Sequence, residues 1–244
     1  MNRFFNQCWI HFSKVNNFSN SYQPNSPKRE TTGIGVIFLF LFCLSLTPNV
    51  FSAVIQIDSI EKLQKIGNDA AYPLNGEYEL TQDIDASDTI NWNSGAGFKP
   101  IGTDADSFTG NFDGNGYKIT GLYINRSTED YIGLFGYVVS GVVVNVGIED
   151  CQIVGKYEVG GLVGFNYGTI FNSYSIGSVQ GKYSIGGLVG ENYDTLSNSY
   201  STGSVKGGGE AGGLVGYNDG TISDSYSTGS VSGSQIIGGL VGYN

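Results

Sequence analysis

Histidine is almost absent from this sequence. The only one, His11, precedes a hydrophobic segment that we interpret below as an export signal, so the exported chain would contain none. Ser-His and Cys-His catalysis both use an imidazole as general base, and histidine is a principal zinc ligand. The sequence therefore excludes these two forms of nucleophilic catalysis and argues against a zinc site.

Cysteine and basic residues are also scarce. After residue 52 one cysteine remains, Cys151, so no intramolecular disulfide can form in that part of the chain. Residues 1–52 hold four of the 12 basic and one of the 22 acidic residues, which leaves eight against 21, a net charge of −13. A chain this acidic repels phosphate backbones and anionic membranes. We therefore exclude a nucleic-acid partner and expect a protein suited to solubility outside the cell.

Long hydrophobic runs are limited to one, between Gly33 and Leu46. It follows two basic residues, is too short to span a membrane comfortably, and is followed by small residues up to Ala53. We interpret residues 1–53 as a secretory signal peptide with a long n-region. A retained N-terminal membrane anchor is the alternative, whereas a lipid anchor on Cys43 is disfavoured by the bulky Phe42 before it.

Glycine, in contrast, is abundant, with 38 residues, and much of it belongs to an internal repeat. The phrase Gly-Leu-Val-Gly, one further residue and Asn recurs four times with a step of 26 residues. Its glycines and asparagines, to which we assign a structural role in the repeat, are Gly161, Gly164, Asn166, Gly187, Gly190, Asn192, Gly213, Gly216, Asn218, Gly239, Gly242 and Asn244. Paired glycines in every unit suggest a close backbone approach or a tight corner.

The composition of one unit indicates which kind of repeat architecture it forms. Each phrase is followed by a segment such as Thr195-Leu196-Ser197-Asn198-Ser199-Tyr200-Ser201 and then by Gly-Ser-Val. No run free of Gly, Ser and Asn is long enough for three helical turns, and Val, Ile, Tyr and Thr alternate with small polar residues. The unit is therefore two or three short strands joined by turns, and stacked units form an all-β solenoid with 26-residue coils.

Alternation within the coil predicts which side chains face inward. Aligning the segment after Val144 with the later units gives two apolar columns: Val144, Ile170, Leu196 and Ile222, and then Ile148, Tyr174, Tyr200 and Tyr226. A third column contains Val146, Asn172, Asn198 and Asp224. Its polar members either form a hydrogen-bonded ladder inside or are turned to solvent by a bulge, and we favour the bulge because an unpaired inward carboxylate is costly.

The repeated phrase, together with its Tyr-Ser-x-Gly-Ser-Val tail, resembles the GLUG-motif repeat of secreted bacterial proteins. That repeat occurs in large surface and extracellular polypeptides and in non-catalytic regions of immunoglobulin A peptidases. The resemblance covers roughly residues 58–244. It implies a right-handed parallel β-helix-like scaffold with a surface or adhesive role, and it supplies no catalytic residues to carry over.

The part before the regular coils predicts a cap. Asp58 as N-cap, Glu61 three residues later and Gly67 at the end predict one short helix, the only helix of the exported chain, which covers the first coil. We divide the remaining chain into an N-terminal cap with irregular coils, residues 54–130, and regular coils, residues 131–244. The last coil is incomplete in this sequence, so we expect a truncated repeat array and end-to-end self-association of the piece.

Acidic residues suggest two further site types, neither of which we adopt. Asp83, Asp85 and Asp88, with Asp104 and Asp106, could hold calcium or form an acid pair, but the spacing does not match an EF-hand and aspartate in loops mostly makes turns. Some polysaccharide lyases are parallel β-helices whose sites resemble an aspartate cluster beside basic residues. The single arginine after residue 53 weakens that interpretation, so we predict no cofactor and leave calcium as an alternative.

Tyrosines near each repeated asparagine are our candidate ligand-binding residues: Tyr167, Tyr193, Tyr217 and Tyr243. Spaced aromatic side chains can stack on sugar rings, and the alternative is that they merely cover the glycine corner. Cys151 aligns with Gly177, Gly203 and Gly229, which suggests a small residue at a crowded turn.

Together these features favour a secreted or cell-surface scaffold without catalysis of its own. We expect it to be part of a larger polypeptide that binds a cell-surface or matrix glycan or protein, with no membrane span after the signal. The alternatives are a carbohydrate-active β-helix enzyme and a non-catalytic part of a secreted peptidase.

Export gives a direct test of the signal interpretation. If residues 1–53 contain a cleaved signal, N-terminal sequencing of the secreted protein begins near Ala53 or Val54. Intact protein held in the membrane fraction would instead identify a retained anchor.

Overall fold

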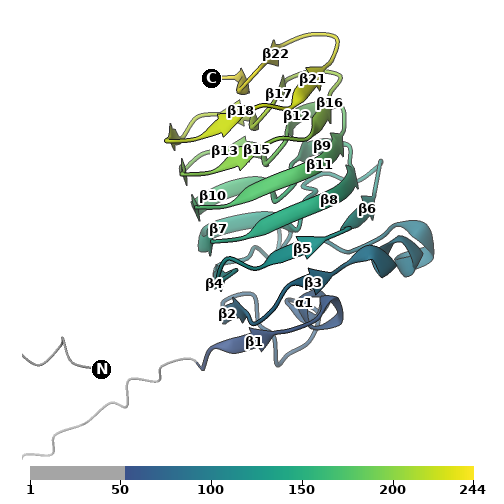
Figure 1. Ribbon diagram of the computed structural model, residues 1–244, viewed down its shortest axis with the longest axis vertical. Coiled ribbons are helices and arrows are strands. Elements are labelled where there is room, and N and C mark those ends of the chain that lie inside the picture. The colour runs from purple at the N-terminus through teal and green to yellow at the C-terminus, as the bar shows by residue number, and fades with distance from the viewer. Residues whose placement is uncertain (1–52) are drawn as a thin grey trace, which may run out of the picture. The chain divides into compact units, whose positions relative to one another are not determined.

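The computed structural model describes residues 53–244, which form a parallel β-solenoid (Figure 1). Each coil from β9 (Tyr157–Val159) onward passes through three sheets, here called A, B and C, and the earlier coils have strands in sheets A and B. In one coil, β9 belongs to sheet C, β10 (Val163–Phe171) to sheet A and β11 (Tyr174–Gln180) to sheet B. Neighbouring strands in all three sheets are parallel. The expected all-β solenoid is confirmed.

The three sheets differ in length. Sheet A has ten strands: β1 (Ile55–Ile57), β2 (Glu77–Leu80), β4 (Asn111–Asp113), β7 (Phe135–Val144), β10, β13 (Val189–Asn192), β14 (Thr195–Ser197), β18 (Val215–Asn218), β19 (Thr221–Ser223) and β23 (Val241–Tyr243). Sheet B has nine: β3 (Ile84–Asp85), β5 (Lys118–Thr120), β6 (Tyr123–Asn125), β8 (Gly147–Val154), β11, β15 (Tyr200–Ser201), β16 (Ser204–Lys206), β20 (Tyr226–Ser227) and β21 (Ser230–Ser232). Sheet C has four: β9, β12 (Tyr183–Gly186), β17 (Ala211–Gly212) and β22 (Ile237–Gly238).

Two helices accompany the first coils. α1 (Ile60–Lys65) buries Ile60 and Leu63 beside β1, at the N-terminal end of the described solenoid (Figure 1). Its N-cap is Ser59, whose Oγ accepts from the Lys62 amide at 3.3 Å, and not Asp58, which instead pairs with the Lys62 ammonium at 2.8 Å. The predicted cap residue was therefore wrong by one position.

A 3-10 helix, η1 (Ser87–Gly95), was not expected. It is organised by polar side chains: the Asp85 carboxylate accepts from the Ser87 amide at 2.9 Å, and Asp88 accepts from Asn91 and Trp92. A helix organised by local side-chain hydrogen bonds does not need a periodic pattern of apolar residues, so the sequence contains no sign of it. The prediction of a single helix was therefore wrong. Within residues 53–244 neither helix is long and apolar enough to cross a membrane.

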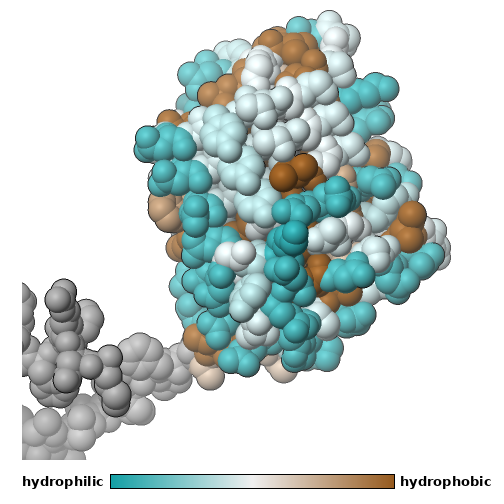
Figure 2. Space-filling model, in the orientation of Figure 1, coloured by the Kyte–Doolittle hydropathy of each residue, from teal (hydrophilic) through white to brown (hydrophobic). Residues whose placement is uncertain are grey.

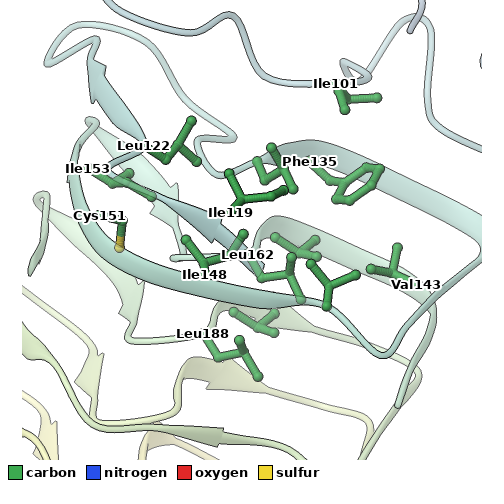
Figure 3. Close-up of a cluster of buried hydrophobic side chains, with 14 of the residues drawn as sticks. Ile101, Ile119, Leu122, Phe135, Val143, Ile148, Cys151, Ile153, Leu162 and Leu188 are labelled. Atoms are coloured by element: carbon green, nitrogen blue, oxygen red, sulfur yellow. The ribbon is translucent and has the colours of Figure 1, made fainter. Parts of the chain in front are cut away.

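The core is built from columns of apolar side chains, one member per coil. One such column contains Leu134, Leu162, Leu188 and Leu214, all fully buried. Figure 3 shows Leu162 and Leu188 in the interior, near Ile148 and Ile119 of sheet B. Full burial of one such side chain contributes about 1.5–3 kcal/mol, so stability accumulates coil by coil.

The predicted columns are partly wrong because the register changes before the regular coils begin. Val143, and not Val144, pairs with Ile170, which in turn pairs with Leu196 and then Ile222. Tyr174 pairs with Gly147, and Ile148 pairs with Ser175. Ser175 and Ser201 therefore point inward with Ile148, while the tyrosines point outward.

The polar residues of the third predicted column explain why inward and outward positions are exchanged after the corner. Asn172, Asn198 and Asp224 all have φ of +49° and are exposed. A residue in the left-handed region at the corner between sheets A and B turns its own side chain to solvent and shifts the alternation that follows. The favoured interpretation, that these polar side chains face solvent, is confirmed.

A ladder of buried asparagine side chains runs through sheet A. The Nδ2 of Asn166 donates to the Oδ1 of Asn192 at 2.8 Å, and the same bond joins Asn192 to Asn218 and Asn218 to Asn244, each 26 residues apart. Each Nδ2 also donates to a carbonyl two residues further along its own chain segment, for example Asn166 to Gly168. Asn166 and Asn192 are fully buried, so each amide has its partners inside the protein.

The glycines of the phrase let successive coils approach. A Cβ placed on Gly190, Gly216 or Gly242 would lie 2.5–2.7 Å from the carbonyl oxygen of the corresponding glycine one coil earlier. Such a distance is inside van der Waals contact, so a side chain at these positions would force the coils apart.

Replacing Asn192 by Ala is expected to lower the free energy of unfolding by about 2–4 kcal/mol. The substitution leaves the Asn218 Oδ1 and the Asp194 carbonyl without their donor and opens a small void. Urea unfolding followed by far-UV circular dichroism measures the loss. The matched control is Asn198→Gly, which keeps the left-handed backbone of an exposed asparagine and is expected to change stability by less than about 0.5 kcal/mol. Equal stability of the two variants would show that the ladder does not contribute.

Candidate binding surface

The four candidate tyrosines lie on the outer side of sheet A, in two neighbouring columns. Tyr217 and Tyr243 come directly before the ladder asparagine and pair with each other in β18 and β23. Tyr167 and Tyr193 come directly after it. Because the asparagine between the columns points inward, both kinds of tyrosine point outward.

The structure joins these tyrosines to three aromatic residues that sequence reasoning missed. Phe165 and Tyr137 are paired in β10 and β7, in the column of Tyr217, and their rings stack with centroids 4.3 Å apart. Tyr131 packs edge-on against both rings, at 5.1 and 5.9 Å. We call the whole set the aromatic strip: Tyr131, Tyr137, Phe165, Tyr167, Tyr193, Tyr217 and Tyr243. Phe165 could have been found from its place before Asn166, whereas Tyr131 could not, because it lies in the preceding irregular coil.

The rings of the aromatic strip are in contact from one coil to the next. Tyr167 and Tyr193 stack at 4.9 Å, and Tyr217 and Tyr243 stack at 5.2 Å with ring planes 3° from parallel. Tyr193 and Tyr217 connect the two pairs at 5.7 Å. In such an arrangement much of each ring face is covered by its neighbour, and ring edges and phenol hydroxyls remain for a ligand. Tyr167 and Tyr243 are the most open, with 45% and 47% of their surface exposed.

Carboxylates border the aromatic strip. We call the following residues the acidic rim: Asp104, Asp130, Glu158, Glu191, Glu210 and Asp219. Burial raises the pKa of Tyr131, Tyr137, Tyr193 and Tyr217, and the rim carboxylates raise each of these further. The strand register agrees with this, because Glu191 pairs with both Phe165 and Tyr217, and Asp219 directly follows the ladder residue Asn218.

Two rim glutamates meet at one serine. Ser184 is buried, with φ of +54°, and its Oγ lies 2.7 Å from Glu191 Oε1 and 3.0 Å from Glu210 Oε2. One hydroxyl has one hydrogen to donate, so it cannot satisfy both carboxylates when both are ionised. Burial, opposed by the bond from Ser184, raises the pKa of Glu191.

Glu158 has the most perturbed carboxyl group of the rim. Burial is the main cause, and the charges of Glu191 and Asp130 add to it, so its pKa rises to about 7. The ammonium of Lys156 opposes the shift but lies at 3.6 Å from Asp130, with which it pairs. Glu158 is therefore partly protonated at neutral pH.

A cleft of about 380 Å³ continues the aromatic strip at Tyr131. Its walls include Lys99, Asp104, Arg126 and Asp130. The Arg126 guanidinium donates to both carboxylate oxygens of Glu129, at 3.0 and 3.1 Å. The cleft thus combines an aromatic ring with carboxylates and is large enough for a small polar ligand.

A second aromatic ladder lies on sheet B, on the outside of the coils. Tyr174, Tyr200 and Tyr226 stack at 4.8 and 5.0 Å with ring planes within 3° of parallel. The Tyr174 hydroxyl donates to Glu149 at 2.9 Å, and Glu149 pairs with Lys118. The face in Figure 2 is hydrophilic over the N-terminal coils and close to neutral in hydropathy over much of the later coils. The prediction that these tyrosines point inward was wrong.

The aspartates considered for calcium are distributed over β3, η1 and the loops before and after them. Asp83 accepts from the Lys118 amide at 3.1 Å, and Asp104 from the Ala105 amide at 3.0 Å. Backbone bonding from Ser87 lowers the pKa of Asp85. Over residues 53–244 no three potential metal ligands gather at one place.

Cys151 is a buried free thiol that pairs in register with Gly177. Burial raises its pKa to about 11. The prediction that it aligns with the glycine of the later coils is confirmed, and the thiol is suited to packing rather than to nucleophilic attack.

Comparison with known proteins gives a family match over the regular coils. The GLUG motif matches three times, at residues 155–180, 181–206 and 207–232. No solved structure matches the chain.

Two curated relatives match part of the chain. The chain is 42% identical over 130 residues to a protein named halomucin from Haloquadratum walsbyi. The aligned segment covers 51% of this chain and 1% of halomucin. It is 43% identical over 99 residues to a protein named putative Gly-rich membrane protein from Evansella cellulosilytica. This aligned segment covers 39% of this chain and 11% of the relative. The chain thus spans a small fraction of the length of both.

The motif boundaries coincide with the coils of the structure. The first copy contains β9, β10 and β11, which is one passage through sheets C, A and B. The other two copies contain the corresponding strands of the next two coils. Residues 155–232 are therefore three consecutive GLUG motifs, each forming one 26-residue coil of a parallel β-solenoid.

Proposed function

We propose that this chain is a rigid, non-catalytic segment of a surface repeat polypeptide that binds glycans through the aromatic strip. The observation that carries the proposal is the strip itself: seven aromatic side chains gathered along one outer face by the repeat register. The names of both relatives, halomucin and putative Gly-rich membrane protein, suit a surface polypeptide.

The scaffold part of the proposal rests on the stacking of the coils. The regular coils from Asn166 onward are joined to one another by parallel backbone bonds, apolar columns and the asparagine ladder. A solenoid of this kind resists bending between the regular coils because each of them contacts its neighbours over all three sheets. It therefore holds outward side chains at constant spacing, which is useful for adhesion to a repeating polymer.

The proposal that the chain is non-catalytic rests on the chemistry of its ionisable side chains. The aromatic strip carries tyrosines with raised pKa values, which are poor bases at neutral pH. The buried thiol of Cys151 has a raised pKa and is closed to solvent. Residues 53–244 contain no histidine.

A glycan array tests this proposal with the full chain and two double variants. Removing two rings of the aromatic strip, with Tyr167→Ala and Tyr193→Ala, is expected to weaken binding by about tenfold or more, because buried aromatic anchors dominate such interfaces. The control is Tyr200→Ala with Tyr226→Ala, which removes two stacked rings from sheet B and leaves the strip intact. Circular dichroism and thermal melts of both variants verify that they fold.

Three results would contradict the proposal. The first is that no glycan binds, and the second is that both double variants lose binding equally. The third is turnover of a saccharide that disappears with Glu191→Gln, which would show an enzyme instead of a scaffold.

A further inference from the structure

Carboxylates lie within and beside the aromatic strip, where Glu191 pairs in register with both Phe165 and Tyr217. The charged groups that raise the pKa of Tyr131, Tyr137, Tyr193 and Tyr217 are carboxylates of the acidic rim: Asp104, Asp130, Glu158, Glu191, Glu210 and Asp219. Electrostatic complementarity between such a face and its ligand favours a cation and disfavours a uronate or a sulfated sugar.

The cations nearest the strip have partners of their own. Lys156 pairs with Asp130 and lies over the ring of Tyr157, 4.1 Å from its centroid. In the cleft beside Tyr131, the Arg126 guanidinium is bonded to Glu129, and the Lys99 ammonium donates to Asn68 at 2.9 Å. Glu158, Glu191 and Glu210 are in no ion pair with any lysine or arginine of residues 53–244.

These three glutamates are half-buried against the sheet C edge of the strip. Glu191 and Glu210 share the single hydrogen of Ser184. Half-buried carboxylates without a cation are costly, and a ligand ammonium placed among them would recover part of that cost. The phenol hydroxyls of the neighbouring tyrosines can accept hydrogen bonds from the same ammonium group.

The spacing along the strip fits a polymer. The outward columns advance by one strand spacing per coil, about 4.8 Å, and the rings of the strip are 4.3–5.9 Å apart. This is close to the length of one pyranose ring in an extended chain. A polymer lying along the solenoid axis would therefore place its successive sugars against successive coils, which present either an aromatic ring or a carboxylate.

We propose that the aromatic strip and the acidic rim together bind a polysaccharide of amino sugars with free amino groups, with its chain along the solenoid axis. The sugar rings lie against the edges of the tyrosines, and the ammonium groups face Glu158, Glu191 and Glu210. This inference rests on the proposed glycan-binding function and adds the chemical class of the ligand.

The test is calorimetric titration of the full chain with a β-1,4-linked glucosamine hexamer and with the fully N-acetylated hexamer of the same length. The acetylated hexamer keeps the sugar rings and loses the charges. We expect the glucosamine hexamer to bind about tenfold or more tightly than its acetylated counterpart, and the difference to shrink in high salt.

Two variants separate the local site from overall charge. Glu191→Gln removes a rim carboxylate and is expected to weaken glucosamine binding by about fivefold to tenfold. Asp224→Asn makes the same change in net charge at an exposed corner between β19 and β20 and is expected to leave binding unchanged. Thermal melts verify that both variants fold.

Each other outcome overturns the inference. Equal binding of the two hexamers, or binding of neutral glycans alone, refutes the charge argument and leaves the proposed glycan-binding function standing. Equal weakening by Glu191→Gln and Asp224→Asn shows attraction by net charge only. Equally tight binding of hexalysine, an acyclic cation of similar length, shows a site for polycations in general and not for sugars.

Discussion

The bond between one buried asparagine amide and the next is the constraint on which the regular coils depend. A buried amide needs partners for both its oxygen and its nitrogen, and here Asn166 finds one in Asn192, 26 residues later. Inserting or deleting a residue between two ladder asparagines would break that bond or strain a corner. In the preceding coil a valine, Val138, pairs with Asn166. The number of residues that separates paired positions of these two coils is not constant: it is 28 for Phe135 and Val163 but 26 for Cys151 and Gly177. The coil length is constant where the ladder is present and varies where a valine replaces the amide.

The outer surface follows from that constant register. When every coil has the same length, any outward residue is repeated one strand spacing away, and similar side chains come into contact. Tyr174, Tyr200 and Tyr226 form a nearly parallel stack for this reason. On sheet A the same effect brings residues from both sides of the asparagine into the aromatic strip. The repeat therefore creates a continuous surface feature from side chains that are isolated in each single coil.

Much of the fold could be predicted from the sequence, because the period and the composition of the unit leave few other architectures. The side-chain directions could be predicted only in part. The alternation rule fails at Asn172, where one left-handed residue changes the parity and moves Tyr174 outward and Ser175 inward. The acidic rim was missed because Glu158 and Glu210, which share one coil position, are two coils apart with Ser184 between them. Glu191 belongs to a strand of sheet A and meets them only where sheets C and A join. The four strip tyrosines were identified from their place beside the ladder asparagines, whereas Tyr131 joins them through an irregular coil.

Solvent exchange of side-chain amides measures the ladder most directly. The buried Nδ2 hydrogens of Asn166 and Asn192 can exchange only when their coils separate, whereas those of the exposed Asn198 meet water in the native state. In a proton NMR experiment after transfer to heavy water, the account predicts that the Asn166 and Asn192 amide signals persist as long as those of buried backbone amides such as Val189 and Leu214. Their disappearance at the rate of the Asn198 amide would contradict it.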